Sequence, residues 1–147
     1  MLVSGFMVPL NKVLKCEASS SVKDVLNLMM DWSVSAIVVV LEDKPTGIIT
    51  KTDMCWCYLK GISHDTQVGD VMPWTAGMKT IQATADKDTA AKFFERHNIH
   101  HALVVDGNDK IVGLISALDV AKEVAQDARA WPYNRHEDGK VHPIATH

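Results

Sequence analysis

The second half of the chain repeats the first, and this duplication restricts the possible folds more than any other feature of the sequence. A shift of 65 residues superimposes identical residues: Val3 on Val68, Met7 on Met72, Ala18 on Ala83, Val39 on Val104 and Val40 on Val105. One extra residue in a polar turn changes the shift to 66, which superimposes Lys44 on Lys110, Gly47 on Gly113, Ile49 on Ile115 and Asp53 on Asp119. The duplication predicts two similar folding units.

Each copy begins with the signals of an amphipathic helix. In the first copy, Ser21 and Asp24 have capping-box spacing, and apolar residues follow at helical period: Val22, Val25, Leu26 and Met29. In the second copy, a helix is predicted to start near Asp86 and to turn Ala90, Ala91, Phe93 and Phe94 inward. Both helices are therefore expected to cover a core with one face.

Two strands and a second helix are predicted to follow in each copy. Residues 36–41 and 102–105 are continuous apolar runs rich in β-branched residues, which is typical of strands buried on both faces. A polar turn leads to a second strand, over residues 47–50 or 111–116, and another helix opens near Asp53 or Asp119. The predicted α/β (α+β) fold is strand–helix–strand–strand–helix, twice.

One copy of this size has only a marginal core, which favours packing of the two copies against each other. We expect their sheets to pack face to face with pseudo-two-fold symmetry and functional clefts to lie between the halves. The expected domains are residues 1–62 and 63–125. Residues 126–147 lack periodicity and are predicted to form an extended or mobile tail.

Composition excludes several classes of protein. The 147 residues carry 15 basic and 18 acidic side chains, a formal charge of −3 with no basic stripe, which argues against a nucleic-acid partner. The longest apolar run is too short for a membrane helix, and no basic segment precedes an apolar one at the N-terminus. Three cysteines without framework spacing fit reduced thiols. A cytoplasmic location and no membrane are expected.

A seven-residue motif carries the chemistry: GIITKTD at 47–53 and GLISALD at 113–119. Glycine lets a ligand or another backbone come close. The hydroxyl of Thr50 or Ser116 can bond a sugar or phosphate oxygen, and the carboxylate of Asp53 or Asp119 can accept two hydrogen bonds from a ribose diol. The same spacing also fits ordinary helix caps. Duplication in register, with glycine ahead of two aliphatic residues, favours a binding role beside capping.

The motifs and their surroundings resemble a stand-alone tandem pair of cystathionine-β-synthase (CBS) domains, a Bateman module. The resemblance spans residues 3–125 and includes VSAIVVV at 34–40, NIHHALVVD at 98–106 and the lead-in VGDVM at 68–72. It implies two clefts, each lined by both repeats. In one cleft, Ser116 and Asp119 would face the ribose, and Val34, Ser35 and Ala36 would contact the edge of the adenine. Lys15 stands in place of the usual threonine and could reach a phosphate. In the other, Thr50 and Asp53 would hold the ribose, and Ile99, His100 and His101 would line the base pocket. Thr80 has the position of a threonine that often joins the site in this family. Lys51 and His100 would contact the phosphates.

The resemblance implies a regulatory sensor, not an enzyme. Its expected ligand is an adenine nucleotide (AMP, ADP or ATP) as a signal of energy state rather than a cofactor, and its expected partners are a second copy of the chain and an effector protein in trans. Two alternatives stay open: a structural homodimer without ligand, and a module for another adenosyl ligand such as S-adenosylmethionine or NAD(H).

Other conspicuous residues are expected to have structural roles. The cluster of His97, His100 and His101 lacks the further ligands of a zinc site, so no metal is predicted. Trp32 and Trp56 are expected in the core or in a dimer interface. Packing roles are also expected for Met29, Met30, Met54, Cys55 and Cys57.

Overall fold

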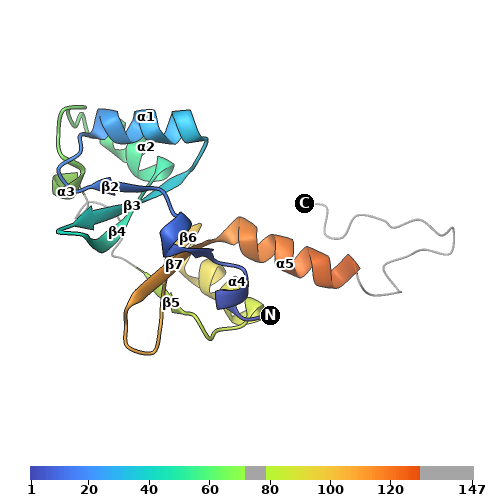
Figure 1. Ribbon diagram of the computed structural model, residues 1–147. Helices are drawn as coiled ribbons and strands as arrows, with labels where there is room; N and C mark the ends of the chain where they lie inside the picture. The colour runs from blue at the N-terminus through green and yellow to red at the C-terminus, as the bar shows by residue number, and fades with distance from the viewer. Residues whose placement is uncertain (72–78, 130–147) are drawn as a thin grey trace, which may run out of the picture.

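The computed structural model describes residues 1–71 and 79–129 and shows the same five elements in each repeat (Figure 1). The first repeat contains β2 (Lys15–Glu17), α1 (Val22–Trp32), β3 (Ala36–Leu41), β4 (Lys44–Thr50) and α2 (Lys51–Leu59). The second contains β5 (Thr80–Gln82), α4 (Lys87–His97), β6 (His101–Val105), β7 (Ile111–Ser116) and α5 (Ala117–Arg129). The predicted order is confirmed in both halves.

Short lead-in segments precede both repeats. The first lead-in holds η1 (Val3–Gly5), β1 (Val8–Pro9) and η2 (Leu10–Lys12), and the second holds α3 (Val68–Val71). Helix α5 runs to Arg129, so it continues beyond residue 126, where the sequence pattern ends. The rest of the predicted tail, and residues 72–78 between α3 and β5, lie outside the described residues.

The two sheets share one topology. In the first, with strand order β2-β3-β4, β2 is parallel and β4 antiparallel to β3. In the second, with order β1-β7-β6-β5, β5 is parallel and β7 antiparallel to β6, and β1 adds an antiparallel edge. Even the register shifts correspond, between Val39 and Val40 and between Val104 and Val105. The duplicated sequence therefore specifies duplicated pairing.

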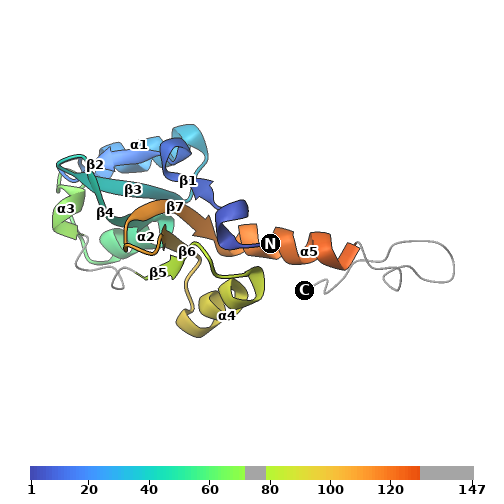
Figure 2. The same cartoon turned by 60° about the horizontal axis from the view of Figure 1, so that its bottom comes forward.

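The sheets face each other across a shared apolar layer. Its buried members come from both repeats: Val13, Ala36, Val38, Val40, Leu103 and Leu114. Full burial of a Val or Leu side chain contributes about 1.5–3 kcal/mol, so this layer alone holds the halves together firmly. Figure 2 shows the two sheets from a second side, with α1 and α4 outside them. Sheet-to-sheet packing agrees with the expectation from the sequence.

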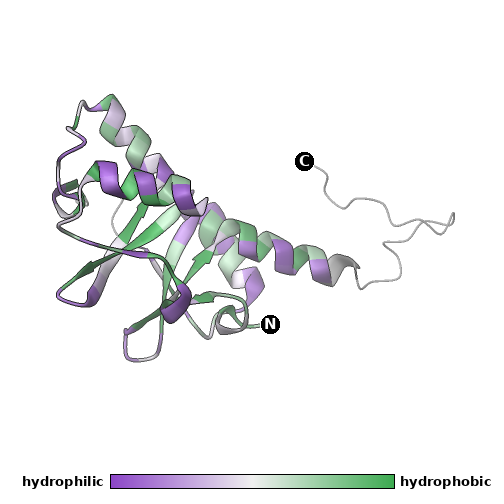
Figure 3. Ribbon diagram, turned by 45° about the horizontal axis from the view of Figure 1, so that its top comes forward, coloured by the Kyte–Doolittle hydropathy of each residue, from purple (hydrophilic) through white to green (hydrophobic). Residues whose placement is uncertain are grey.

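Each helix layer closes a core of its own. Val22, Val25 and Met29 of α1 are buried in the first repeat, and Ala90 and Phe94 of α4 in the second. Figure 3 shows the hydrophobic strands and the alternating hydrophilic and hydrophobic surfaces of the helices. The predicted Ser21 cap is present, since Ser21 Oγ accepts from the Asp24 N–H at 3.0 Å. The helix predicted to start near Asp86 is capped by that residue, whose Oδ1 accepts from the Thr89 N–H at 2.8 Å.

Some predicted packing residues are exposed instead. Leu26 is 37% exposed and Met30 71%, so a core role for these two residues is wrong. Trp32 is 65% exposed and Trp56 47%, which excludes the core and leaves the predicted dimer interface as their alternative. Helix α1 carries apolar residues on more than one face, and only one face meets the sheet. Met29 and Met54 are buried as predicted, and of the two neighbouring cysteines only Cys57 is buried.

The lead-in of each repeat docks on the other repeat. The N–H groups of Val3 and Ser4 donate to the carbonyls of Ala85 and Ala83 at 2.8 and 3.0 Å. The N–H groups of Val68 and Gly69 donate to the carbonyls of Ser20 and Ala18, both at 2.8 Å. Each of these four bonds maps onto its counterpart when the repeats are exchanged. Val3 accordingly lies in the core of the second repeat, and Val68 in the core of the first.

The absence of a side chain at Gly113 allows the first lead-in to lie directly against β7 of the second repeat. Pro9 pairs with Gly113, and a Cβ atom there would lie 2.7 Å from the Val8 carbonyl oxygen and 2.6 Å from Met7 Sδ. The sequence left open whether this glycine admits a ligand or another backbone. At Gly113 the structure shows another backbone.

No helix within residues 1–71 and 79–129 combines the length and apolar character needed to cross a membrane.

Candidate functional site

The first copy of the motif forms a strand-to-helix junction between β4 and α2. Asp53 Oδ2 accepts from the Thr50 N–H at 2.8 Å and from Thr50 Oγ1 at 3.0 Å, while the Asp53 N–H donates to Thr50 Oγ1 at 3.3 Å. This is a reciprocal capping box. Burial raises the pKa of the Asp53 carboxyl, and the bonds from Thr50 oppose that rise.

The second copy forms the equivalent junction between β7 and α5. Asp119 Oδ2 accepts from the Ser116 N–H at 3.0 Å, and the Asp119 N–H donates to Ser116 Oγ at 3.1 Å. Both side chains are half-buried. Here the hydroxyl proton is not used within the box, whereas Thr50 donates its proton to Asp53.

Both motifs therefore cap their helices, as the spacing indicated, but capping engages only part of each aspartate carboxylate. Each box engages Oδ2 and leaves Oδ1 outside it. A carboxylate oxygen held in a fixed direction by its partner oxygen is a prepared acceptor for a hydroxyl donor. The junctions can therefore cap a helix and hold a ligand at the same time.

A neighbouring strand begins beside each junction. Ala36, the first residue of β3, pairs with Thr50, and the Ser35 carbonyl accepts from the Lys51 N–H at 3.0 Å. His101, the first residue of β6, pairs with Ser116, and the His100 carbonyl accepts from the Ala117 N–H at 2.8 Å. The predicted base-contacting segments therefore adjoin the junction of their own repeat.

The two strand starts also meet each other. Ser35 Oγ and His101 Nε2 lie 3.1 Å apart, which is hydrogen-bond distance. The sequence assigned these two residues to different clefts, and nothing in either repeat alone signals the contact. It joins the surroundings of the first junction to those of the second.

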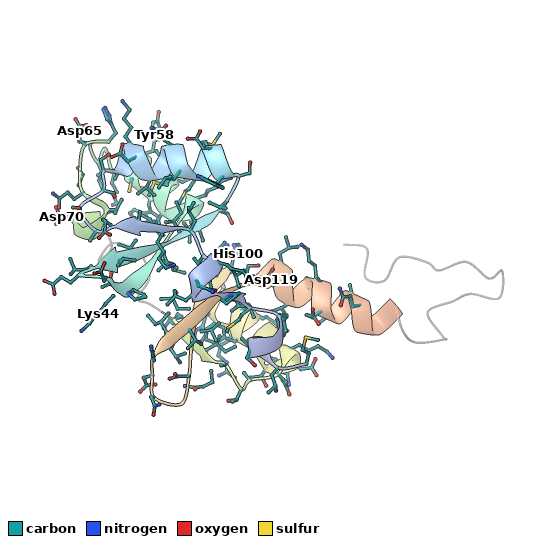
Figure 4. The ribbon with its side chains drawn as sticks, in the orientation of Figure 1. Lys44, Tyr58, Asp65, Asp70, His100 and Asp119 are labelled. Atoms are coloured by element: carbon teal, nitrogen blue, oxygen red, sulfur yellow. The ribbon has the colours of Figure 1, made fainter. Side chains whose placement is uncertain are left out.

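The pKa of His101 is shifted from its ordinary value at this contact. Burial lowers the pKa of its imidazole, the charge of His100 lowers it further, and the carboxylate of Asp119 acts in the opposite direction. Figure 4 places His100 and Asp119 together near the start of α5. The neutral imidazole offers one nitrogen donor and one acceptor to its neighbours.

The remaining predicted residues occupy varied positions. Lys51 and His100 are exposed, at the start of α2 and just before β6. Thr80 and Lys15 begin β5 and β2 and are also exposed, although Lys15 Nζ donates to the Leu10 carbonyl at 2.6 Å. Val34 and Ile99 pack against the cores of their own repeats.

The described residues contain no group of three or more His, Cys, Asp or Glu side chains arranged to hold a metal ion. His101 is half-buried and faces Ser35, while His100 is exposed. Among the cysteines, Cys16 is buried, and burial raises the pKa of its thiol to about 11.

Comparison with known proteins identifies the family. The family model of the CBS domain matches residues 3–59 and again residues 68–126. The chain belongs to the CBS domain family. The recognition of a tandem pair from its sequence motifs is confirmed.

The related CBS proteins are much longer than this chain. Inosine-5′-monophosphate dehydrogenase of Thermoplasma acidophilum is 31% identical over 93 residues, which are 63% of this chain and 18% of the enzyme. L-aspartate semialdehyde sulfurtransferase of Methanocaldococcus jannaschii is 45% identical over 63 residues, 38% of this chain and 12% of the enzyme. The chain thus spans less than a fifth of either relative.

Solved structures share the fold of the CBS pair. CBSX2, crystallised with AMP, has a TM-score of 0.74 and 21% identity, with 87% of this chain and 98% of that one covered. An uncharacterised conserved protein from Pyrococcus horikoshii has a TM-score of 0.73 and 26% identity, with 84% and 91% covered. A CBS domain pair solved with 5′-methylthioadenosine and S-adenosyl-L-methionine has a TM-score of 0.72 and 19% identity, with 86% and 98% covered.

Proposed function

We propose that this CBS pair is a regulatory module that binds an adenine nucleotide (AMP, ADP or ATP) at its junctions and acts in trans on a partner protein. The observation that carries the proposal is the duplicated capping box, which holds one carboxylate oxygen of Asp53 and of Asp119 and leaves the other free for a ribose diol. Each ribose hydroxyl bonded to a carboxylate would contribute about 1.5–3 kcal/mol.

The surroundings supply the other contacts that a nucleotide needs. Lys51 and His100 are exposed cations or potential cations beside the two junctions. They favour a ligand with phosphates over the cationic sulfonium of S-adenosylmethionine. CBSX2 was crystallised with AMP, and a CBS domain of the CNNM/CorC Mg²⁺ transporter family with ATP, which supports the same ligand class. The proposed role is to sense energy state, without catalysis.

Calorimetric titration of the whole chain with AMP, ADP, ATP, S-adenosylmethionine and NADH tests the proposal. Asp53→Ala and Asp119→Ala should each abolish binding at one junction. Because each change also removes a cap, Asp86→Ala is the matched control: it removes the cap of α4, away from both junctions. Binding that survives both junction variants, or is lost equally in Asp86→Ala, would refute the ribose assignment.

A second candidate function is a homodimer that needs no ligand. Large apolar side chains on α1 and α2 are exposed, with Tyr58 at 85%, Leu59 at 80%, Met30 at 71% and Trp32 at 65%. Large apolar side chains that gather on an exposed surface commonly mark interfaces, and α1 and α2 contribute several of them. Sedimentation equilibrium with and without AMP separates the candidates: a dimer unaffected by nucleotide favours the structural module, and a nucleotide-dependent change in assembly favours the sensor. Leu59→Asp should weaken the dimer in either case.

A further inference from the structure

The contact between Ser35 and His101 links two regions that the proposed function treats as separate binding sites. On one side, the carbonyl of Ser35 holds the first helical N–H of α2, from Lys51, at 3.0 Å. The next residue, Ala36, pairs with Thr50 of the first capping box. A movement of the first junction therefore displaces Ser35.

On the other side, His101 is tied to the second junction in the same manner. It pairs with Ser116, and the carbonyl before it, from His100, holds the first helical N–H of α5 at 2.8 Å. The carboxylate of Asp119 also acts electrostatically on the imidazole. A movement or a change of charge at the second junction therefore reaches His101.

Pseudo-symmetry shows that this link is an addition to the duplicated framework. Exchange of the repeats maps Ser35 onto His100 and His101 onto Ala36. Ala36 has no polar side-chain atom, so the symmetry-related position cannot form the same hydrogen bond. One polar bridge thus crosses the pseudo-two-fold axis without a counterpart.

We infer that the Ser35–His101 hydrogen bond couples the two junctions, so that a nucleotide bound at one raises the affinity of the other. This inference rests on the proposed function. Ser35 is exposed, so in the free protein water competes for the bond. A nucleotide over either junction excludes that water and fixes the bond, and the second nucleotide then meets a site that is already ordered.

The coupling is measurable as a ratio of affinities. The affinity of the Asp119 junction for AMP is determined by calorimetry in the parent chain, where the Asp53 junction is filled, and in Asp53→Ala, where it is empty. We expect roughly fivefold tighter binding with the first junction filled, within the usual range of allosteric coupling. In the Ser35→Ala background the ratio should fall to about one.

Matched variants separate this coupling from general damage. Ser19→Ala makes the same chemical change at an exposed serine outside both junctions and should keep the parent ratio. His101→Phe keeps an aromatic ring but removes both nitrogens, and should abolish the coupling as Ser35→Ala does. Agreement of these two variants would assign the effect to the hydrogen bond rather than to either residue alone.

The outcomes distinguish the inference from the function on which it rests. Binding at both junctions with a ratio of one or below in the parent, or with a ratio unchanged by Ser35→Ala, overturns the coupling alone. A single occupied junction in the parent also overturns it. No saturable heat with any adenosyl ligand overturns the proposed function together with the coupling.

Discussion

The two strand-to-helix junctions have the same sequence pattern and the same capping box, yet their polar groups are used differently. At the first, the Thr50 hydroxyl donates to Asp53, and burial raises the pKa of that carboxyl. At the second, the Ser116 hydroxyl proton is not used within the box, and Asp119 lies within electrostatic reach of His101. Duplication preserves the framework of a site, whereas its chemistry is set by neighbours outside the motif.

The largest expected effect comes from the glycine that opens the second motif. Gly113→Val places side-chain carbon against the Val8 carbonyl and Met7, so β1 must leave the sheet or shift. We expect a loss of about 1–3 kcal/mol in the free energy of unfolding, measured with urea. Gly107→Ala is the control, since a Cβ there meets nothing within 4 Å. Equal stability of the two variants would contradict the close docking of the first lead-in.

A smaller effect should separate the junctions by pH. Because burial raises the pKa of folded Asp53 above its ordinary 3.8, the stability contributed by the protonated carboxyl is full below that pH and is lost as the pH rises through the folded pKa. In Asp53→Asn, the free energy of unfolding measured with urea should no longer fall for this reason between about pH 3.5 and about pH 6.5. Asp119→Asn retains Asp53 and should retain the slope. If both variants keep the parent's slope, Asp53 is not the group responsible.

The smallest effect concerns the imidazole beside the second junction. Burial, and then His100, lower the pKa of His101 from 6.5, while Asp119 raises it. The stability linked to neutral His101 is therefore present above pH 6.5 and is lost as the pH falls through the folded pKa. Asp119→Asn should lower this pKa further, and Asp53→Asn should leave it unchanged. An NMR titration of the His101 ring measures both, and an unchanged value in Asp119→Asn would place the carboxylate out of reach.

Much of the fold was predictable because its signals are local and occur twice. Ser21 and Asp86 mark helix starts, and the apolar runs mark central strands, without knowledge of the partner repeat. The exposure of Met30 could not be predicted because α1 has apolar residues on more than one side, and periodicity does not say which side meets the sheet. For the candidate site, the motif predicts the residues of each junction but not their neighbours.

The sequence does not predict hydrogen bonds between residues that lie far apart in the chain. Val3 bonds to Ala85 through backbone groups, which any residue except proline could donate, so no side-chain pattern records the crossing. The Ser35–His101 pair has no symmetric counterpart, and comparison of the two repeats therefore hides it. The hydrogen bond from Lys15 to the Leu10 carbonyl is local, but its acceptor is also a backbone group, which residue type does not reveal.

The crossed lead-ins have a consequence for how this chain can be divided or assembled. A cut near residue 64, between α2 and α3, would leave the first fragment without the segment that contributes Val68 and Val71 to its core, and the second fragment without Val3. Neither fragment would be a complete folding unit, although each would contain a whole set of five strands and helices. Because each core takes residues from the lead-in of the other repeat, we expect the two repeats to fold and unfold in one cooperative step.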